Sequence, residues 1–565
     1  MRPAVLLLAT FFLLVTAATA QSTKTAAAAN KDDCSVAGMV VKLAGSEPLK
    51  SATVQLQNVD DRGRSPSTVH TDSGGHFELK GIQAGRYRLR VMRNGFVSQE
   101  YGQTTPSAPG AILALSPGQE MKDLLFRLIP SATISGRVEN EDGEPLPWAR
   151  VSALRQVYAG GSRTLSLEET VQSNDRGEYR LFGLRPGRYF LAANYRPGDH
   201  EVGQDRQAGF ENADGGREDY VRTFYPGVPD ASKAEAIAVK AGEEIPAMDF
   251  LLQPVAVYRV RGHVYNLVAT DSKRSRNSIV VQLQPKKSEL LYDSYSFGQD
   301  NIVKADGTFD LRGVLPGSYI LSAQWFDDGK PHYARHSIEV GNADVEGVQL
   351  TIAPGMTVPG HVRWEGSPSV AQDLFLTARG VDEDNPVGVH ARVESDGSFT
   401  LNAPPDMPLR VSVYGQSQDS YLKAVTYGGV DYLEDGFTAR AGIAATLEVT
   451  LSSRGAHVQG SVINAEGLPA VGVCVVLVPD GKHRTRLSLY KEAQTDQRGQ
   501  FLLRGISPGD YTLFSWNEVE VGAWEDPDFL KAFEDRGEKV TVQEGEAKSI
   551  NLTAIGTAST EEQKP

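Results

Sequence analysis

The chain is 565 residues long, carries a formal net charge of −14 at pH 7 and contains two cysteines. This length allows several domains, because a domain usually spans about 100–200 residues. The acidic balance disfavours DNA, RNA and anionic membrane surfaces as partners, since these need a basic footprint on the protein. With only Cys34 and Cys474 present, packing must hold the fold, and we expect two buried, unpaired thiols.

The N-terminus has the pattern of a secretory signal peptide. Met1-Arg2 is followed by an apolar run from Ala4 to Val15 and by small residues before Gln21. This run of roughly a dozen residues is shorter than the about twenty that a membrane-spanning helix needs, so cleavage near Ala20 is favoured over an anchor. We therefore expect a signal peptide at 1–20, a linker at 21–33 and no membrane span in the mature chain. The expected location is secreted: periplasmic, extracellular or associated with the cell surface.

A pattern that repeats five times sets the organisation of the remaining chain. Its first copy runs from Gly75 through Phe77 and Gly85 to Tyr87. The same spacing returns over 177–189, 307–319 and 499–511, and a degraded copy runs from 397 to 411. A shorter signature, aliphatic-x-Gly-x-Val, precedes each copy, and its glycines are Gly38, Gly136, Gly262, Gly360 and Gly460. Their spacing of about one hundred residues is that of a small domain rather than of a solenoid repeat.

The second copy shows how one unit is expected to fold. Residues 134–138 and 149–153 alternate apolar and polar side chains around a turn at 141–145, and further short strands are expected up to Leu252. Six or seven strands at this spacing indicate an antiparallel β-sandwich with one face of each sheet buried. The expected core includes the apolar residues of the motif: Phe77, Leu79, Tyr87, Tyr179, Leu181 and Tyr189.

The repeats predict an all-β chain, a tandem array of about five antiparallel β-sandwich domains. Their predicted bounds are 34–130, 131–255, 256–354, 355–455 and 456–555, with a disordered tail at 556–565. The fourth domain diverges, because Ala403-Pro404-Pro405-Asp406 replaces the paired glycines of the motif. Helix should be scarce. One short amphipathic helix is expected over 526–537, where Asp526 caps, Pro527 stands in the first turn, and Phe529 and Phe533 lie four residues apart.

The aliphatic-x-Gly-x-Val start, the Asp-x-x-Gly-x-Phe turn and the Leu-x-Gly-x-x-Pro-Gly-x-Tyr turn resemble the carboxypeptidase regulatory-like family. They are also similar to the related surface-protein B-type and starch-binding-like modules. Four of the five units carry the resemblance well. It implies a transthyretin-like or prealbumin-like sandwich, similar to an Ig-like one, in a secreted bacterial protein. It also implies that the module is an accessory and not a catalyst.

The sequence offers little for catalysis or metal binding. His336 and Glu339 have a zinc-like spacing, but on a strand they should point to opposite faces, and a zinc site needs a third ligand. We therefore expect no cofactor and no catalytic or metal site, and zinc carboxypeptidase-related activity is the least favoured interpretation. Acidic turns at 141–143, 327–329 and 382–385 lack the alternating carboxylates of a dedicated calcium loop, which favours solvated turns and leaves calcium binding open.

Aromatic side chains are the remaining candidates for ligand contact, because sugar recognition uses the flat faces of Trp and Tyr. Tyr225 has counterparts at Tyr101 and Tyr427, and a residue repeated in three units favours an architectural role. The candidate ligand-contact aromatics outside the repeated pattern are Tyr292, Tyr295, Phe297 and Trp524.

The favoured interpretation is a secreted, non-enzymatic protein that binds carbohydrate or cell-surface ligands through its modules. Its partner would be a polysaccharide or an envelope or cell-surface protein, and not a nucleic acid. The alternative is a structural spacer or partner-docking arm of the bacterial envelope. Five sandwiches can form a rod or a cluster, because domain contacts within a chain are usually modest. Repulsion within the acidic surface slightly favours the rod.

Overall fold

The computed structural model describes residues 32–61, 63–105, 108–195, 218–268, 279–286, 301–327, 330–367, 373–381, 388–440 and 445–556. These residues form five β-sandwich modules. Module 1 holds strands β1–β8, module 2 β9–β18, module 3 β20–β25, module 4 β26–β34 and module 5 β35–β42. The predicted signal peptide, most of the linker and residues 557–565 lie outside the described residues.

The strands of modules 1 and 2 are short, and most alternate between buried and exposed side chains. Module 1 has β1 Cys34–Lys42, β2 Thr53–Asn58, β3 Ser67–His70, β4 His76–Ile82, β5 Gly85–Met92, β6 Gln99–Glu100, β7 Leu113–Leu115 and β8 Glu120–Leu128. Module 2 has β9 Ala132–Glu139, β10 Arg150–Ala159, β11 Ser162–Gln172, β12 Glu178–Leu184, β13 Gly187–Asn194, β14 Glu218–Asp219, β15 Thr223–Phe224, η1 Ala231–Lys233, β16 Ile237–Val239, β17 Glu244–Ile245 and β18 Phe250–Leu251. Strand β19 Val255–Ala256 pairs with β14 at the passage to module 3.

Modules 3 to 5 repeat this plan. Module 3 has β20 Tyr258–Asn266, β21 Val280–Pro285, β22 Thr308–Val314, β23 Gly317–Asp327, β24 Lys330–Val340 and β25 Val345–Ile352. Module 4 has β26 Met356–Glu365, β27 Phe375–Gly380, β28 Gly388–Arg392, β29 Ser398–Ala403, β30 Pro408–Tyr414, β31 Tyr421–Tyr427, β32 Val430–Asp431, β33 Phe437–Thr438 and β34 Leu447–Ser452. Module 5 has β35 Ala456–Ile463, β36 Cys474–Pro479, η4 Gly481–Thr485, η5 Leu487–Leu489, β37 Lys491–Gln494, β38 Gln500–Ile506, β39 Gly509–Trp516, η6 Ala523–Glu525, α1 Pro527–Lys531, η7 Glu534–Arg536, β40 Glu538–Val542, β41 Ala547–Ser549 and β42 Leu552–Thr553.

All five modules share one topology. The first strand of each module lies inside one sheet, between an antiparallel partner and the last strand, to which it runs parallel; in module 1 this order is β4-β1-β8. The same arrangement recurs around β9, β20, β26 and β35. The remaining pairs are antiparallel, so each module is a β-sandwich with a parallel pair at its first strand. This confirms the predicted fold class and adds the parallel pair.

The two sequence signatures meet across one ladder. In every module the glycine of the first strand is the register partner of the motif aromatic, as in Gly38 with Phe77. A Cβ at this glycine would lie far inside contact distance of a backbone oxygen of the last strand, Leu124 O in module 1 and Ile550 O in module 5. Only glycine fits here, because the last strand approaches too closely for any side chain.

The tyrosine that ends the motif bonds to the turn that precedes it. The hydroxyls of Tyr87, Tyr189, Tyr319 and Tyr511 each donate to the carbonyl oxygen four residues earlier, at 2.8–2.9 Å. Module 4 has Val411 at this position and lacks the bond, as its divergent sequence predicts.

Each module buries its own hydrophobic core between its two sheets. The predicted core residues are confirmed, since all six are at most 6% exposed: Phe77, Leu79, Tyr87, Tyr179, Leu181 and Tyr189. Cys34 and Cys474 are free and buried, as predicted. Burial raises the pKa of the Cys474 thiol to about 12, which makes it a packing residue rather than a nucleophile.

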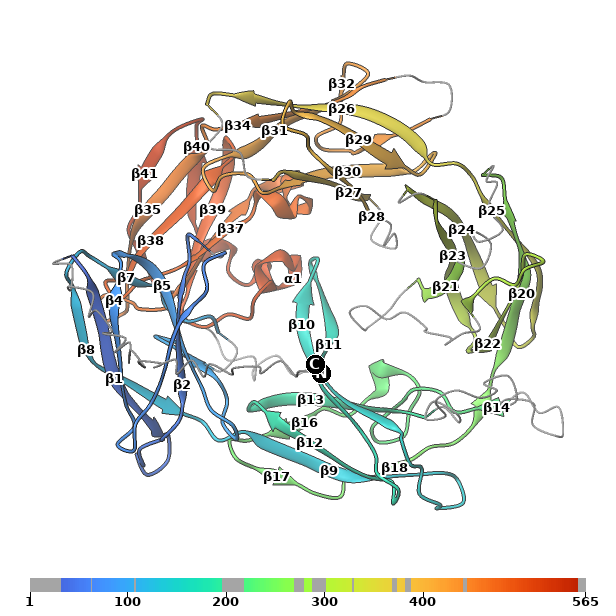
Figure 1. Ribbon diagram of the computed structural model, residues 1–565, viewed down its shortest axis with the longest axis horizontal. Helices are drawn as coiled ribbons and strands as arrows, with labels where there is room; N and C mark the ends of the chain where they lie inside the picture. Colours follow the sequence, from blue (N-terminus) through green and yellow to red (C-terminus); the bar gives the residue numbers. More distant parts are fainter. Residues whose placement is uncertain are drawn as a thin grey trace, which may run out of the picture.

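The five modules close into a ring (Figure 1), with one sheet of each module facing outward and the other facing the centre. Module 5 returns to module 1, where the Gln497 side chain bonds both the amide and the carbonyl of Ala114 at 3.0 and 2.6 Å. Arg88 of module 1 donates to Gln494 of module 5 at 2.8 Å. The slight preference for a rod is therefore wrong, because specific polar bonds at the junction oppose the diffuse repulsion of the acidic surface.

A hairpin of module 2 also reaches module 5. The tip between β10 and β11 lies toward the ring centre in Figure 1, where Tyr158 packs edge-on against Phe529 at 6.0 Å. The Glu525 carboxylate accepts backbone hydrogen bonds from Gly160 and Gly161. Module 5 thus contacts modules 1, 2 and 4, and the ring is braced across its centre.

The predicted helix is confirmed but shorter. Helix α1 starts after Asp526, whose side chain accepts from the amide of Asp528, and it ends at Lys531. A 3-10 turn, η7, follows, and Gly537 stays extended (φ −90°) instead of closing the helix. Among the described residues, no helix is long and apolar enough to cross a membrane.

Candidate binding surfaces

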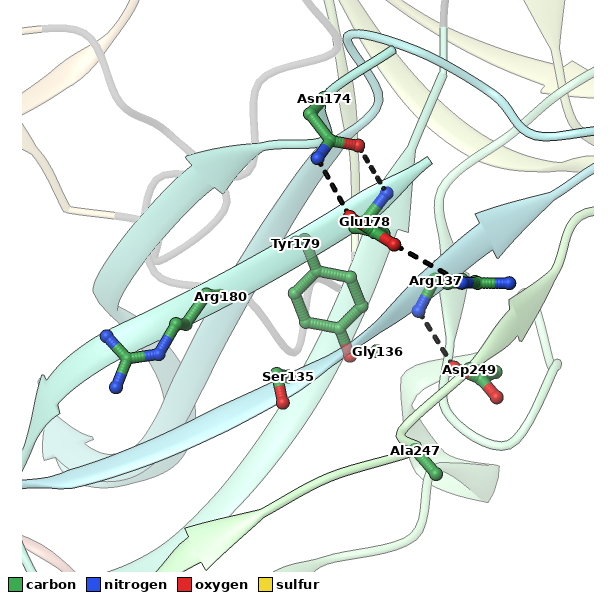
Figure 2. A pocket seen from close by; sticks show the side chains of 9 residues that line it. All are labelled: Ser135, Gly136, Arg137, Asn174, Glu178, Tyr179, Arg180, Ala247 and Asp249. Carbon is green, nitrogen blue, oxygen red and sulfur yellow. Dashed lines mark hydrogen bonds and ion pairs between the residues drawn. The ribbon is translucent and has the colours of Figure 1, made fainter. Parts of the chain in front are cut away.

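An open hollow of about 560 Å³ lies on the outward sheet of module 2 (Figure 2). It is lined by Ser135, Gly136, Arg137, Asn174, Glu178, Tyr179, Arg180, Ala247 and Asp249. Arg137 pairs with Glu178 at 3.2 Å, and its backbone amide donates to Asp249 at 2.8 Å. The Tyr179 hydroxyl donates to the Met248 carbonyl.

This hollow has the chemistry of a structural feature. Hydrogen bonds from Asn174 and then Arg137 hold the pKa of Glu178 below its ordinary value, so this carboxylate stays ionised and does not serve as a general acid near neutral pH. The hollow lies beside a bulge of the last strand at Ala247 (φ 61°), and corresponding positive-φ residues occur at Asp123 and Gly347. A feature repeated in three modules is better explained by the fold than by a ligand.

The predicted ligand-contact aromatics do not form a site among the described residues. Tyr292, Tyr295 and Phe297 lie outside them. Trp524 is only 4% exposed and packs with Trp516, Phe514 and Phe533 in a second apolar cluster of module 5. Its ring faces are covered by this packing, so its position favours a structural role over sugar contact.

The repeated tyrosines pack as the sequence indicates. Tyr101, Tyr225 and Tyr427 each contact the core of their own module, and Tyr225 meets Phe250 edge-on at 6.1 Å. Phe224 is 3% exposed. These residues therefore serve the architecture.

His336 and Glu339 lie on β24, which pairs only with β23 at the sheet edge. Both side chains are exposed, and their three-residue separation places them on opposite faces of the strand. The described residues include no group of three or more His, Cys, Asp or Glu side chains that could hold a metal ion. Of the acidic turns, 141–143 is described and exposed, whereas 382–385 and 328–329 lie outside the described residues.

Five exposed aromatics are absent from the sequence-based candidates, and four of them lie on strands. The four are Phe182, Tyr265, Phe375 and Tyr414, and the fifth, Trp148, lies in the turn before β10; each is between 43% and 58% exposed. Phe375 and Tyr414 are direct register partners on β27 and β30. The alternation of apolar residues in the sequence could have revealed this pair. Leu376 and Ala378 on β27, and Val411 and Val413 on β30, point into the core, so Phe375 and Tyr414 point to the opposite face.

Two segments of the chain, residues 35–115 and 133–205, match the model of the carboxypeptidase regulatory-like domain. The chain is also 22% identical over 232 residues to the BOS complex subunit NOMO1 of Mus musculus, covering 40% of this chain and 15% of that protein. Among solved structures it is similar to the Bacillus anthracis TIE protein, with 13% identity, 57% and 51% of the two chains covered and a TM-score of 0.16. It is also similar to the minor pilin GBS52 of Streptococcus agalactiae, with 10% identity, 40% and 96% covered and a TM-score of 0.21.

Modules 1 and 2 therefore contain carboxypeptidase regulatory-like domains, as the motifs predict. These domains are non-catalytic modules. Modules 3 to 5 share the strand order and the glycine–aromatic pairing of modules 1 and 2. The chain is thus a multidomain protein of β-sandwich modules, two of which contain this non-catalytic domain.

Proposed function

We propose that this chain is an exported, non-enzymatic binding protein whose five modules act together as one compact head for carbohydrate or another cell-surface ligand. The ring closure carries this proposal, because module 5 is bonded to module 1 through Gln497 and to module 2 through Glu525. A spacer arm gains its length by keeping its ends apart. The bonds between the first and fifth modules bring the ends together, which supports a head.

The N-terminal sequence supports export. The run from Ala4 to Val15 and the small residues before Gln21 have the pattern of a cleaved signal peptide. N-terminal sequencing of the secreted protein should therefore begin at or near Gln21. An intact Met1 on cytosolic protein would contradict export.

A glycan array with the purified mature protein tests the binding proposal. We expect saturable binding to a subset of polysaccharides with no turnover. If no glycan binds, and the protein instead binds one purified envelope protein, the docking arm of the envelope becomes the better account.

A further inference from the structure

The inward sheet of module 4 presents a face that combines arginines with exposed aromatics. Phe375 and Tyr414 stand opposite each other on β27 and β30, and Arg392 on β28 is the other register partner of Phe375. The rings are 44% and 53% exposed. We call Phe375, Arg379, His390, Arg392, Arg410 and Tyr414 the basic aromatic face.

These six side chains lie on one side of the sheet. The alternate residues Leu376, Ala378, Val389 and Ala391 are buried in the core of module 4, which leaves their neighbours on the face toward the ring centre (Figure 1). Strands β27 and β30 stay paired along this face, and Arg379 is the register partner of Arg410, four residues along each strand from the Phe375–Tyr414 pair. The face therefore offers a two-ring platform at one end and two guanidinium groups at the other.

The charge of this face opposes that of the whole chain. The face carries three arginines and His390. The described acid at its border is Asp373, whose carboxylate pairs with Arg392 at 2.6 Å. Arg379 and His390 have no ion-pair partner among the described residues. Arg410 donates to the backbone oxygens of Glu434 and Thr485, and Thr485 lies in the η4 turn together with Lys482 and Arg484. The positive surface thus continues onto module 5, and Glu434 of module 4 and Glu534 of module 5 neutralise part of it by pairing with Arg486 and Arg484.

We propose that the basic aromatic face binds an acidic polysaccharide, that is, a chain of pyranose rings bearing carboxylates. Aromatic faces pack against the apolar faces of sugar rings, and guanidinium groups bind carboxylates through paired, charge-assisted hydrogen bonds. An exposed pair of rings beside arginines suits a ligand that has both features. The proposal rests on the proposed binding function and names the ligand class of one module.

Binding to polygalacturonate by isothermal titration calorimetry at low and at 150 mM salt tests it. Phe375→Ala is expected to weaken binding about fivefold at both salt concentrations. The double variant Arg379→Gln, Arg392→Gln is expected to weaken it about tenfold or more at low salt. Asp373→Asn removes the opposing charge and should tighten binding. Phe182→Ala is the matched control, because Phe182 is a phenylalanine that is 58% exposed on a strand of module 2, and it should change nothing.

Three results would overturn the proposal. The first is the absence of polygalacturonate binding while neutral glucans bind, which leaves the general binding function intact. The second is equal binding to poly-glutamate or duplex DNA with no effect of Phe375→Ala, which would indicate a polyanion surface without sugar recognition. The third is unchanged affinity in the arginine variant. Thermal unfolding of each variant, matched to the parent protein, confirms that losses arise at the face. Silence on every glycan would instead reject the proposed function itself.

Discussion

At the scale of residues, one glycine in each first strand controls how the two ends of a module meet. Gly460 lies where the segment between β41 and β42 runs beside β35, and an added Cβ would overlap the carbonyl of Ile550. A backbone carbonyl cannot move aside as the end of a flexible side chain can. The glycine is therefore a requirement of the parallel pair and not of a turn.

Gly460→Ala should destabilise module 5 by about 3 kcal/mol, at the upper end of the cost of overpacking a core. Scanning calorimetry would show the transition of module 5 shifted to lower temperature. Gly341→Ala is the control, since nothing lies within 4 Å of the added Cβ, and its effect should stay within about 0.5 kcal/mol. Equal effects of the two substitutions would contradict this account.

The tyrosine at the end of the motif makes a second, separable contribution. Removing the Tyr511 hydroxyl in Tyr511→Phe leaves the Ser507 carbonyl without its partner and should cost about 1 kcal/mol. Burial raises the pKa of Tyr511 to about 12 from its ordinary value of 10.0. A raised pKa means that the folded state favours the neutral phenol. This contribution is therefore complete below pH 10 and is lost as the pH rises through about 12.

Urea unfolding as a function of pH measures this effect. The parent protein should lose more stability between pH 10 and 12 than Tyr511→Phe does, because the variant has no hydroxyl to ionise at this position. Parallel losses in the two proteins would show that Tyr511 does not contribute.

At the scale of elements, one carboxylate of module 5 gathers several partners from module 4. Glu544, in the turn between β40 and β41, accepts hydrogen bonds from Tyr421, Ser452 and Arg454 of module 4 and its linker. Lys423 adds an ion pair at 3.2 Å. The hydrogen bond from Ser452 and then that from Arg454 lower the pKa of Glu544 to about 2.

The junction should therefore loosen in acid. A lowered pKa means that the contribution is present above the ordinary value of 4.5 and is lost as the pH falls toward about 2. Glu544→Gln should loosen it already at pH 7, seen as faster hydrogen exchange of the amides in β31 and β41. Glu466→Gln, in an exposed turn of the same module, is the control. If substitution of Glu544 leaves the exchange rates unchanged, the other contacts of the junction are enough to hold modules 4 and 5 together.

The elements also show what the sequence predicts and what it does not. Alternation predicts the strands and cores, because the buried parity of residues such as Leu79 and Leu181 is a local property. The helix at Asp526 was predicted from its cap and proline for the same reason. The sheet that this helix packs against is not part of the prediction. Its strand β36 reads Cys474-Val-Val-Leu-Val-Pro479, and all six residues are buried. Such an unbroken apolar strand is typical of a sheet covered on both faces, which accounts for the burial of Trp524.

At the scale of the whole molecule, ring closure depends on residues with no pattern of their own. Gln497 bonds Ala114 and Arg88 bonds Gln494, each across about four hundred positions of the chain, and nothing in the local sequence marks these pairs. The basic aromatic face on module 4 is partly predictable from the sequence, because strand alternation places Phe375 and Tyr414 on the face opposite the buried residues of β27 and β30. Its position toward the ring centre follows only from how the modules are arranged.

The closure can be opened by removing these bonds. The double variant Gln497→Ala, Arg88→Ala removes the hydrogen bonds between Gln497 of module 5 and Ala114 of module 1, and between Arg88 of module 1 and Gln494 of module 5. The described contacts that remain at this junction include the backbone bridge between Ile112 and Asp496, the Thr104–Asn517 hydrogen bond at 3.4 Å and the close approach of Gly472 to Gly102. The first module should then separate from the fifth, aided at low salt by the repulsion between acidic modules, which extends about 10 Å at 0.1 M.

Small-angle scattering of the mature protein measures this directly. A compact globule of this length has a radius of gyration of about 24 Å, whereas five modules in a line would give one on the order of 50 Å. We expect the parent protein to lie near the lower figure at every salt concentration and the double variant to move upward as salt is removed. Arg90→Ala is the matched control, because its side chain bonds only Ser98 within module 1. A parent protein near 50 Å would reject the closed head and restore the extended arm, since a binding surface shared by the inward sheets exists only while module 5 holds module 1.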